Sequence, residues 1–228
     1  MLEPESRIAD VGGGTGRYAE WLVEHGHAVE LLDPVPLHIE QATARAAGRF
    51  GTHVGDARAL PYDDASFDAV LLFGPLYHLS ARDDRLLTLR EASRVCRSGG
   101  IVAATVISRY AGLLDHLKGG RIADPAVFVN VMAQTVNGRR VPPEHRIGVF
   151  PDAYFHLPQE LADEFEEAGL GTADIYAVQG LGWLATEFLE LWADPVGQAH
   201  VLEIAERFER EPSVQAISPH LLAVGTKP

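Results

Sequence analysis

The sequence predicts an α/β protein built on an open sheet of mostly parallel strands. Three observations support this prediction. A strand, a glycine-rich turn, a helix and a second strand follow one another between Arg7 and Pro34, and strands and helices go on alternating as far as Ile107. Ala69 to Phe73 is an unbroken apolar run, which is typical of a strand buried on both faces. A fold of this class binds its ligands at the carboxyl edge of the sheet.

Length and composition favour one sizeable domain of a soluble, cytoplasmic protein. The chain has 228 residues, 46% of them hydrophobic, with no apolar run of about 18 residues and no basic-then-apolar leader. The single cysteine, Cys96, excludes an intramolecular disulfide and is expected in the core. A net charge of −13 disfavours nucleic acid as a partner and favours a small neutral or cationic substrate.

The first strand, Ile8 to Val11, leads into a turn with four glycines in five residues: Gly12, Gly13, Gly14 and Gly16. Such a turn accepts positive φ and lets a ligand approach the backbone. A helix from Arg17 to Glu24 follows, with Tyr18 and Leu22 expected to face the sheet, and Asp33 ends the second strand. A carboxylate there can accept both hydroxyls of a ribose, so the pattern indicates a nucleoside-bearing cofactor.

The same turn also fits a nicotinamide fingerprint, with Gly14, Gly16 and Ala19 as G-x-G-x-x-A. Asp10, at the end of the first strand, argues against this alternative. A carboxylate aimed at the turn is unfavourable under a pyrophosphate but suits a ligand with cationic groups.

An acid followed by G-x-G-x-G resembles the first motif of the class I S-adenosylmethionine-dependent methyltransferases. The resemblance implies a doubly wound, mostly parallel sheet of seven strands, with S-adenosyl-L-methionine as cofactor and S-adenosyl-L-homocysteine as product. A second motif runs from Asp56 through Leu60-Pro61 to Ser66-Phe67-Asp68, and it implies that Asp56, after a third strand from Phe50 to Val54, binds the adenine amino group. The cofactor-binding residues implied are Asp10, Gly12, Gly14, Gly16, Asp33, Pro34, Asp56, Ala57, Phe73 and Gly74.

The fourth strand delivers Gly74-Pro75-Leu76-Tyr77-His78 to the same edge as the glycine turn. Tyr77 and His78 are therefore the catalytic candidates, because a histidine there could take a proton from a substrate hydroxyl or amine. The alternative is that Tyr77 packs on the cofactor and His78 only hydrogen-bonds a loop carbonyl. This segment and Pro158 to Leu161 resemble the bacterial "type 11" small-molecule group of the family.

We expect a single methyltransferase domain over residues 1–228, with substrate-lid insertions at about 108–150 and 181–215. The candidate lid residues are Arg109, Tyr110, His116 and His156, although a solvated helix face explains the first three equally well. Trp183 and Trp192 are expected to pack in a core. The other predicted elements are helices at Pro36–Ala47, Arg82–Arg97, Tyr110–Lys118, Pro125–Thr135, Trp183–Ala193 and Ala199–Arg210, a helix from Pro158 closed by Gly169, and strands at Ile101–Ile107, Ala173–Val178 and His220–Gly225.

The predicted reaction is methyl transfer to an oxygen or nitrogen of a small molecule by in-line displacement. It requires no metal, and the sequence contains no convincing cluster of metal ligands. Two alternatives remain. One is an NAD(P)-dependent reductase on a Rossmann-like fold, which Asp10 and Asp56 disfavour, and the other is a non-catalytic binding protein that keeps the fold. No membrane contact is expected, and a homodimer is considered.

Overall fold

The computed structural model describes residues 2–140 and 152–228 and divides into two compact units. The first unit consists of Met1–Thr105, Ala162–Asp174 and Ala223–Pro228, and the second of Val106–Leu161 and Ile175–Leu222. The glycine turn and both sequence motifs belong to the first unit. Both predicted insertions belong mainly to the second.

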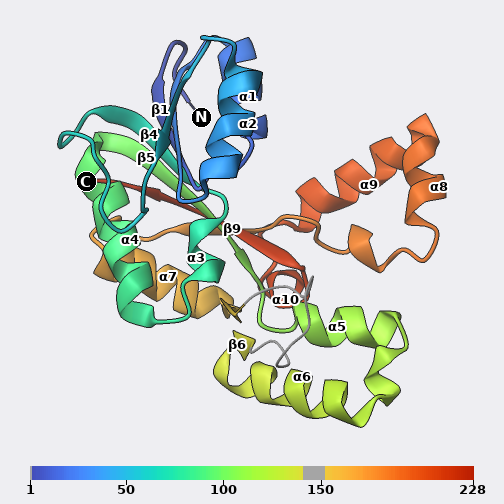
Figure 1. Cartoon of the computed structure of the whole chain (residues 1–228). Coiled ribbons are helices and arrows are strands. Elements are labelled where there is room, and N and C mark those ends of the chain that lie inside the picture. Colours follow the sequence, from blue (N-terminus) through green and yellow to red (C-terminus); the bar gives the residue numbers. More distant parts are fainter. Residues whose placement is uncertain (1, 141–151) are drawn as a thin grey trace. The chain divides into compact units, whose positions relative to one another are not determined.

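A seven-stranded sheet confirms the predicted fold class (Figure 1). Its strands, in the order β3-β2-β1-β4-β5-β9-β8, are β3 (Gly51–Val54), β2 (Ala28–Asp33), β1 (Arg7–Val11), β4 (Phe67–Leu72), β5 (Cys96–Ile107), β9 (His220–Thr226) and β8 (Asp174–Ala177). The pairs β1–β2, β2–β3, β1–β4 and β4–β5 are parallel. The chain order reverses between β1 and β4, which makes their carboxyl ends the switch point where such sheets bind ligands.

The helices of the first unit are α1 (Arg17–Glu24), α2 (Pro36–Ala46), α3 (Pro75–His78), α4 (Arg82–Val95) and most of α7 (Pro158–Glu167). Figure 1 shows α1 and α2 side by side, and α1 packs on β2 while α2 packs on β2 and β3. The core is mainly apolar: Ile8, Leu31, Leu72 and Leu89 are completely buried. These contacts hold the ends of β1, β2 and β4 in fixed register.

Two predictions about the first unit are wrong. Strand β5 begins at Cys96 rather than Ile101, so Cys96 lies in a strand and not in the predicted helix. It is fully buried as expected, and burial raises the pKa of its thiol to about 11. Tyr18 does not face the sheet. Ala19 and Leu22 occupy the buried positions of α1, and Tyr18 is 53% exposed.

The second unit is mostly helical. Its helices are α5 (Ala111–Lys118), η1 (Arg121–Ala123), α6 (Pro125–Asn137), η2 (Gly182–Leu184), α8 (Phe188–Ala193), α9 (Pro195–Phe208) and α10 (Pro212–Gln215). The predicted helix from Trp183 starts only at Phe188. Trp192 is 40% exposed and stacks on Phe188, so the expectation of core packing is wrong for it.

A short antiparallel pair, β6 (Arg139–Arg140) and β7 (Ala153–Tyr154), lies in a region expected to contain no sheet. Two residues per strand give no periodic pattern from which to predict it. Residues 141–150 of the first predicted insertion, and residue 151, lie outside the described residues. None of the helices in the described ranges is both long and apolar enough to cross a membrane.

Candidate functional site

The glycine turn follows β1 directly and needs glycine for two different reasons. Gly12, Gly14 and Gly16 have φ of 72°, 56° and 82°, a region that other residues rarely adopt. Gly13 needs the space, because a Cβ there would lie 2.5 Å from Oδ2 of Asp10. A Cβ at Gly14 would meet nothing within 4 Å, so this side of the turn is open to a ligand.

Asp10 lies beneath this turn as a completely buried carboxyl group. Neither of its carboxylate oxygens has a hydrogen-bond partner among the described residues. Burial raises the pKa of Asp10 to about 7, and the charge of Asp33 adds to the rise; the nearby Ala19 N–H, although it does not meet the geometry of a hydrogen bond, partly offsets it. A buried acceptor of this kind costs free energy unless a donor or a cation satisfies it. Together with Gly12, Gly14, Tyr18 and Phe73 it lines a hollow of about 180 Å³.

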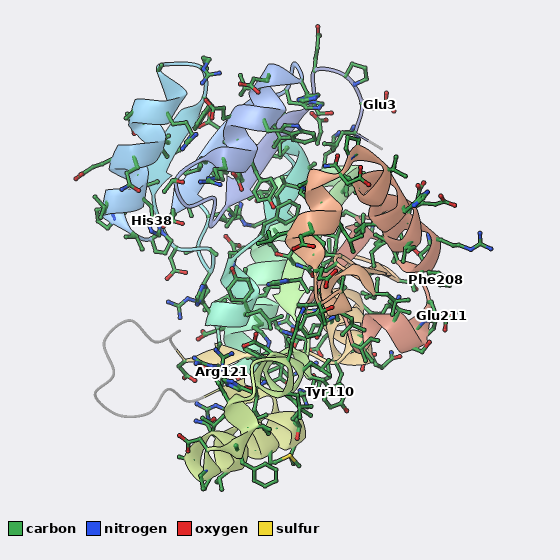
Figure 2. All side chains as sticks on the ribbon, turned by 90° about the vertical axis from the view of Figure 1, so that its right-hand side faces the viewer. Glu3, His38, Tyr110, Arg121, Phe208 and Glu211 are labelled. Atoms are coloured by element: carbon green, nitrogen blue, oxygen red, sulfur yellow. The ribbon has the colours of Figure 1, made fainter. Side chains whose placement is uncertain are left out.

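Asp33, 5% exposed at the end of β2, connects the turn to the neighbouring strand. Its Oδ2 accepts the Gly14 amide at 3.0 Å, and its Oδ1 accepts the Val35 amide at 2.9 Å and contacts Nδ1 of His38 at 3.0 Å. His38, labelled in Figure 2 on α2, was not predicted as a site residue. Each carboxylate oxygen has two lone pairs, so Oδ2 keeps one acceptor position for a ligand hydroxyl.

Asp56 follows β3 and is engaged by a neighbouring arginine. Its Oδ2 lies 2.6 Å from Nη2 of Arg58, and Nη1 of the same arginine lies 3.2 Å from Asp84. The guanidinium of Arg58 holds the pKa of Asp56 below its ordinary value. The carboxylate is 49% exposed, so it stays accessible while it is fixed in direction. Pro34 is exposed, and Ala57 is half-buried.

The tip of β4 lies against the glycine turn, as predicted. A Cβ at Gly12 would lie 2.7 Å from Cγ of Pro75, and a Cβ at Gly74 would lie 3.2 Å from the Gly12 carbonyl oxygen. Gly12 therefore has both too little space for a Cβ and a positive φ, whereas the contact at Gly74 is tight. Phe73 meets Tyr18 edge to face, with ring centroids 5.0 Å apart. Tyr18 thus joins the site although its sequence position suggested the core.

Tyr77 and His78 stand on the single turn of α3, with ring centroids 4.5 Å apart. Burial lowers the pKa of His78, while the nearby charge of Asp33 works in the opposite direction. Burial raises the pKa of Tyr77, and Tyr18 adds to the rise. At neutral pH His78 is therefore a neutral imidazole and Tyr77 a neutral phenol, the forms that a proton acceptor and a hydrogen-bond donor need.

Arg85 and Glu164 were missed by the sequence analysis, yet they hold the segment that follows α3. The guanidinium of Arg85 donates to the carbonyls of Leu79 and Ser80 at 3.1 and 3.2 Å and to Glu164 Oε1 at 2.7 Å. Both charged side chains are 2% exposed. No local sequence pattern pairs residues 79 positions apart, so only the folded structure reveals this ion pair.

The four lid candidates have different positions in the second unit. Arg109 is buried and bound to Glu160 at 2.6 Å and to the Phe155 carbonyl, which makes it a structural residue. His156 is fully buried, with its ring 4.7 Å from that of Tyr154. Tyr110 is half-buried and precedes α5. Only His116 lines a cleft, one of about 860 Å³ that lies within this unit.

Within residues 2–140 and 152–228, no three His, Cys, Asp or Glu side chains are grouped so as to hold a metal ion. The described site consists of the glycine turn, the carboxylates of Asp10, Asp33 and Asp56, and the Tyr77-His78 pair. It offers acceptors to hydroxyls and cations. Arg17 also lines the hollow, so one guanidinium group stands beside the turn and its carboxylates.

Residues 9–104 match the "Methyltransferase domain" family. A demethylmenaquinone methyltransferase from Roseiflexus castenholzii is 33% identical over 190 residues, which cover 77% of this chain and 72% of that protein. A bovine protein named "Probable tRNA methyltransferase 9B" is 34% identical over 98 residues, which cover 43% of this chain and 20% of its own length. A solved structure of a SAM-dependent methyltransferase from Methanosarcina mazei has the same fold, with a TM-score of 0.68, 17% identity and coverage of 99% and 94% of the two chains.

The extent of the match to the Roseiflexus protein shows the family, and the family match covers the glycine turn, Asp33, Asp56 and the segment with Tyr77 and His78. The chain belongs to the class I S-adenosylmethionine-dependent methyltransferases. This confirms the family that the acid and glycine motif indicated.

Proposed function

We propose that this protein binds S-adenosylmethionine at the carboxyl edge of β1, β2 and β3 and transfers its methyl group to an oxygen or nitrogen of a small molecule. The observation that carries the proposal is Asp10. A fully buried carboxyl group without a hydrogen-bond partner among the described residues, under a turn with open space above Gly14, fits a ligand that brings positive charge.

Each part of the cofactor has a matching group in this chain. Asp33 accepts the ribose hydroxyls, because Oδ2 retains a lone pair and its direction is fixed by the Gly14 amide. Asp56, oriented by Arg58, and the adjacent Ala57 take the adenine ring. Asp10 balances the positive charge, while Phe73 and Gly74 form the wall. When bound, the cofactor supplies a methyl group that its sulfonium already activates for displacement.

The chain contributes orientation and, where the acceptor must lose a proton, a base. His78 is neutral at pH 7 because burial lowers its pKa, so its imidazole can accept that proton. The buried pair of Arg85 and Glu164 fixes the backbone after α3 and with it the direction of His78. Holding the acceptor and the methyl carbon in line supplies much of the rate enhancement.

We propose a single methyltransferase domain whose insertions, at about 108–150 and 181–215, form the acceptor side. Nucleic acid is the second candidate acceptor, because one relative is named as a tRNA methyltransferase. The net charge of −13 favours a small molecule, since a polyanion would be repelled. A filter-binding titration with bulk tRNA separates the two, and saturable binding at physiological salt would favour RNA.

Calorimetric titration with S-adenosylmethionine, S-adenosylhomocysteine and NADH in parallel tests the cofactor. We expect saturable binding of the first two and none of NADH. Binding of NADH alone would contradict the role given to Asp10. Release of S-adenosylhomocysteine with a panel of phenols, carboxylic acids and amines then tests turnover. Cofactor binding without turnover on any acceptor would support the non-catalytic alternative.

A further inference from the structure

A cleft of about 860 Å³ lies within the second unit, and none of its lining residues belongs to the cofactor site described above. Its volume falls in the range of about 300–1,000 Å³ typical of pockets for small organic ligands. Its walls are largely apolar and come from β5, α5, η1, α6, the start of β9 and the segments around β6, β7 and η2. The apolar lining residues that matter here are Ile107, Val127, Val131, Phe155 and Trp183.

Trp183 presents an apolar surface to this cleft because its polar atoms are already engaged. Its indole Nε1 donates to the Ile217 carbonyl at 3.0 Å, and Lys118 donates to its backbone carbonyl at 2.6 Å. The ring is thereby fixed in place. A fixed aromatic wall of this kind selects a ligand with apolar rings.

Two histidines line the same cleft, and their hydrogen bonds determine where each carries its proton. Nε of Arg121 donates to Nδ1 of His116 at 2.9 Å (Arg121 is labelled in Figure 2). Because an arginine can only donate, Nδ1 of His116 is an acceptor and the proton is on Nε2. Burial and the charge of Arg121 lower the pKa of His116, in agreement with a neutral ring.

His220 has the same tautomer for an equivalent reason. Its backbone amide donates to Oε1 of Gln179 at 3.1 Å, which fixes the orientation of that amide group. Nε2 of Gln179 therefore faces Nδ1 of His220 at 2.8 Å and donates to it. Burial lowers the pKa of His220. Across residues 2–140 and 152–228, neither His116 nor His220 has a hydrogen-bond partner at Nε2, so each ring keeps one N–H to offer.

The carboxylates that line the cleft are already engaged. Asp115 pairs with Arg121, and Asp124 accepts the Ala126 and Val127 amides at the start of α6. The guanidinium groups of Arg121 and Arg140 line the same cleft, so the two carboxylates leave it without a net negative charge that would favour an ammonium group. A carbonyl, hydroxyl or phenolate oxygen would find two N–H donors.

We infer that this cleft binds the acceptor substrate and that the substrate is an apolar ring compound carrying carbonyl or hydroxyl oxygens, rather than an amine. That the ligand is the methyl acceptor rests on the proposed function, whereas the chemical class of the ligand follows from the cleft alone. His116 and His220 are donors that orient the oxygens. Neither acts as a base, because Nδ1 is occupied and Nε2 already carries a proton.

Two probes with the same ring system test the class: 1-naphthol, which offers an oxygen acceptor, and 1-naphthylmethylamine, which is a cation at neutral pH. Binding is measured by tryptophan fluorescence and calorimetry. We expect 1-naphthol to bind saturably and at least about tenfold more tightly than the amine. Equal affinity, tighter binding of the amine, or no binding of 1-naphthol would overturn the inference.

Matched variants locate the binding. Val127→Trp fills the cleft and should abolish 1-naphthol binding, whereas Val129→Trp, at a 67% exposed position of the same helix that does not line the cleft, should not. His116→Phe and His220→Phe should each weaken 1-naphthol binding about three- to tenfold, the effect of one hydrogen bond. His200→Phe on α9, exposed and outside the cleft, is the control. Undiminished binding by Val127→Trp would contradict the location.

Titration with S-adenosylhomocysteine distinguishes this inference from the proposed function. All five variants should bind it as the wild type does, because the cofactor residues belong to the first unit. If the wild type binds 1-naphthol in the cleft but not S-adenosylhomocysteine, the methyltransferase proposal fails and the ligand class stands. If it binds S-adenosylhomocysteine but prefers the amine, the ligand class fails alone.

Discussion

The buried ion pair between Arg85 and Glu164 connects α4 to α7 and fixes the backbone immediately after His78. Nη2 of Arg85 lies 2.7 Å from Oε1 of Glu164, and the same guanidinium donates to the Leu79 and Ser80 carbonyls. All three guanidinium nitrogens therefore have an acceptor, in a site where both side chains are 2% exposed. Another ion pair between the same two helices, Arg82 of α4 and Glu167 of α7, lies at the surface with side chains 50% and 44% exposed.

Replacing glutamate by glutamine should lower the free energy of unfolding much more in the buried pair than at the surface. Glu164→Gln leaves a buried guanidinium without its charge partner, so the free energy of unfolding should fall by about 3–5 kcal/mol. Glu167→Gln removes two exposed ion pairs, with Arg82 and with Arg90, and should cost less than about 1 kcal/mol. Urea denaturation of both variants under one condition measures the difference. Equal losses would mean that the Arg85 site is hydrated.

Asp10 should make the cofactor-free protein less stable as the pH rises. Its pKa is about 7 in the folded chain against an ordinary value of 3.8, so between these values the folded state binds a proton that the unfolded state has lost. Stability from this group therefore falls as the pH rises from about 4 to about 7 and stays low above it. The shift corresponds to about 4 kcal/mol. Asp10→Asn should lose this dependence and gain stability at pH 8, as measured by denaturation across that range.

Binding of the cofactor should release the proton that Asp10 holds in the cofactor-free protein. If a positive charge above Asp10 stabilises the carboxylate, binding below pH 7 must release a proton, and affinity for S-adenosylmethionine should rise by up to about tenfold per pH unit until pH 7. Calorimetry in two buffers of different ionisation enthalpy counts the protons released. In Asp10→Asn the count should fall to zero. An unchanged count in this variant would assign the proton to another group.

Gly14 and Gly26 form a matched pair for testing the turn. Both have positive φ, 56° and 86°, and at both a Cβ would meet nothing within 4 Å. Substitution by alanine should therefore cost each about 1–2 kcal/mol of stability. Only Gly14→Ala places a methyl group on the open side of the turn, so only this variant should lose affinity for S-adenosylmethionine, by more than about tenfold. Similar affinities in both variants would remove Gly14 from the site.

His78 should act as the base with any acceptor that must lose a proton. Substitution by alanine should lower kcat by about 10²–10⁴-fold for a phenolic acceptor found by release of S-adenosylhomocysteine. Because the pKa of His78 lies below 6.5, the wild-type rate should stay constant down to about pH 6.5 and fall only in more acidic solution. His53→Ala, an exposed histidine paired with Glu30, is the control. A rate unchanged in His78→Ala would support the alternative in which His78 only hydrogen-bonds a carbonyl.

The sequence predicted the first unit well because its signals are local. An apolar run marks each parallel strand, and the clustered glycines mark the turn after β1, where three residues have positive φ. The same signals placed Gly74 and Pro75 beside Gly12, since parallel strands bring their carboxyl ends to one edge. Strand β5 was cut short because Gly99 and Gly100 read as a turn, although the backbone continues through them as a strand.

The remaining features depend on tertiary contacts that no periodicity encodes. Tyr18 is exposed because Ala19 and Leu22 fill the buried face of α1. The pairing of Arg85 with Glu164 joins distant helices, and the burial of Asp10 depends on how the turn closes over it. In the second unit, His116 was one of four equivalent candidates, and His220 was not a candidate at all. Their common role follows only from the hydrogen bonds that fix their tautomers.

The division of the first unit into three chain segments has a consequence for the order of synthesis. The glycine turn emerges early, but the unit also needs Ala162–Asp174 and the Ala223–Thr226 portion of β9. A Cβ at Gly225 would lie 2.8 Å from the ring of Phe165, which shows how closely these late segments fit together. Because a compact unit folds cooperatively, the nascent chain must carry an incomplete sheet until β9 has been made. The glycine turn is thus translated before the segments that complete its unit, and it is stabilised only after them.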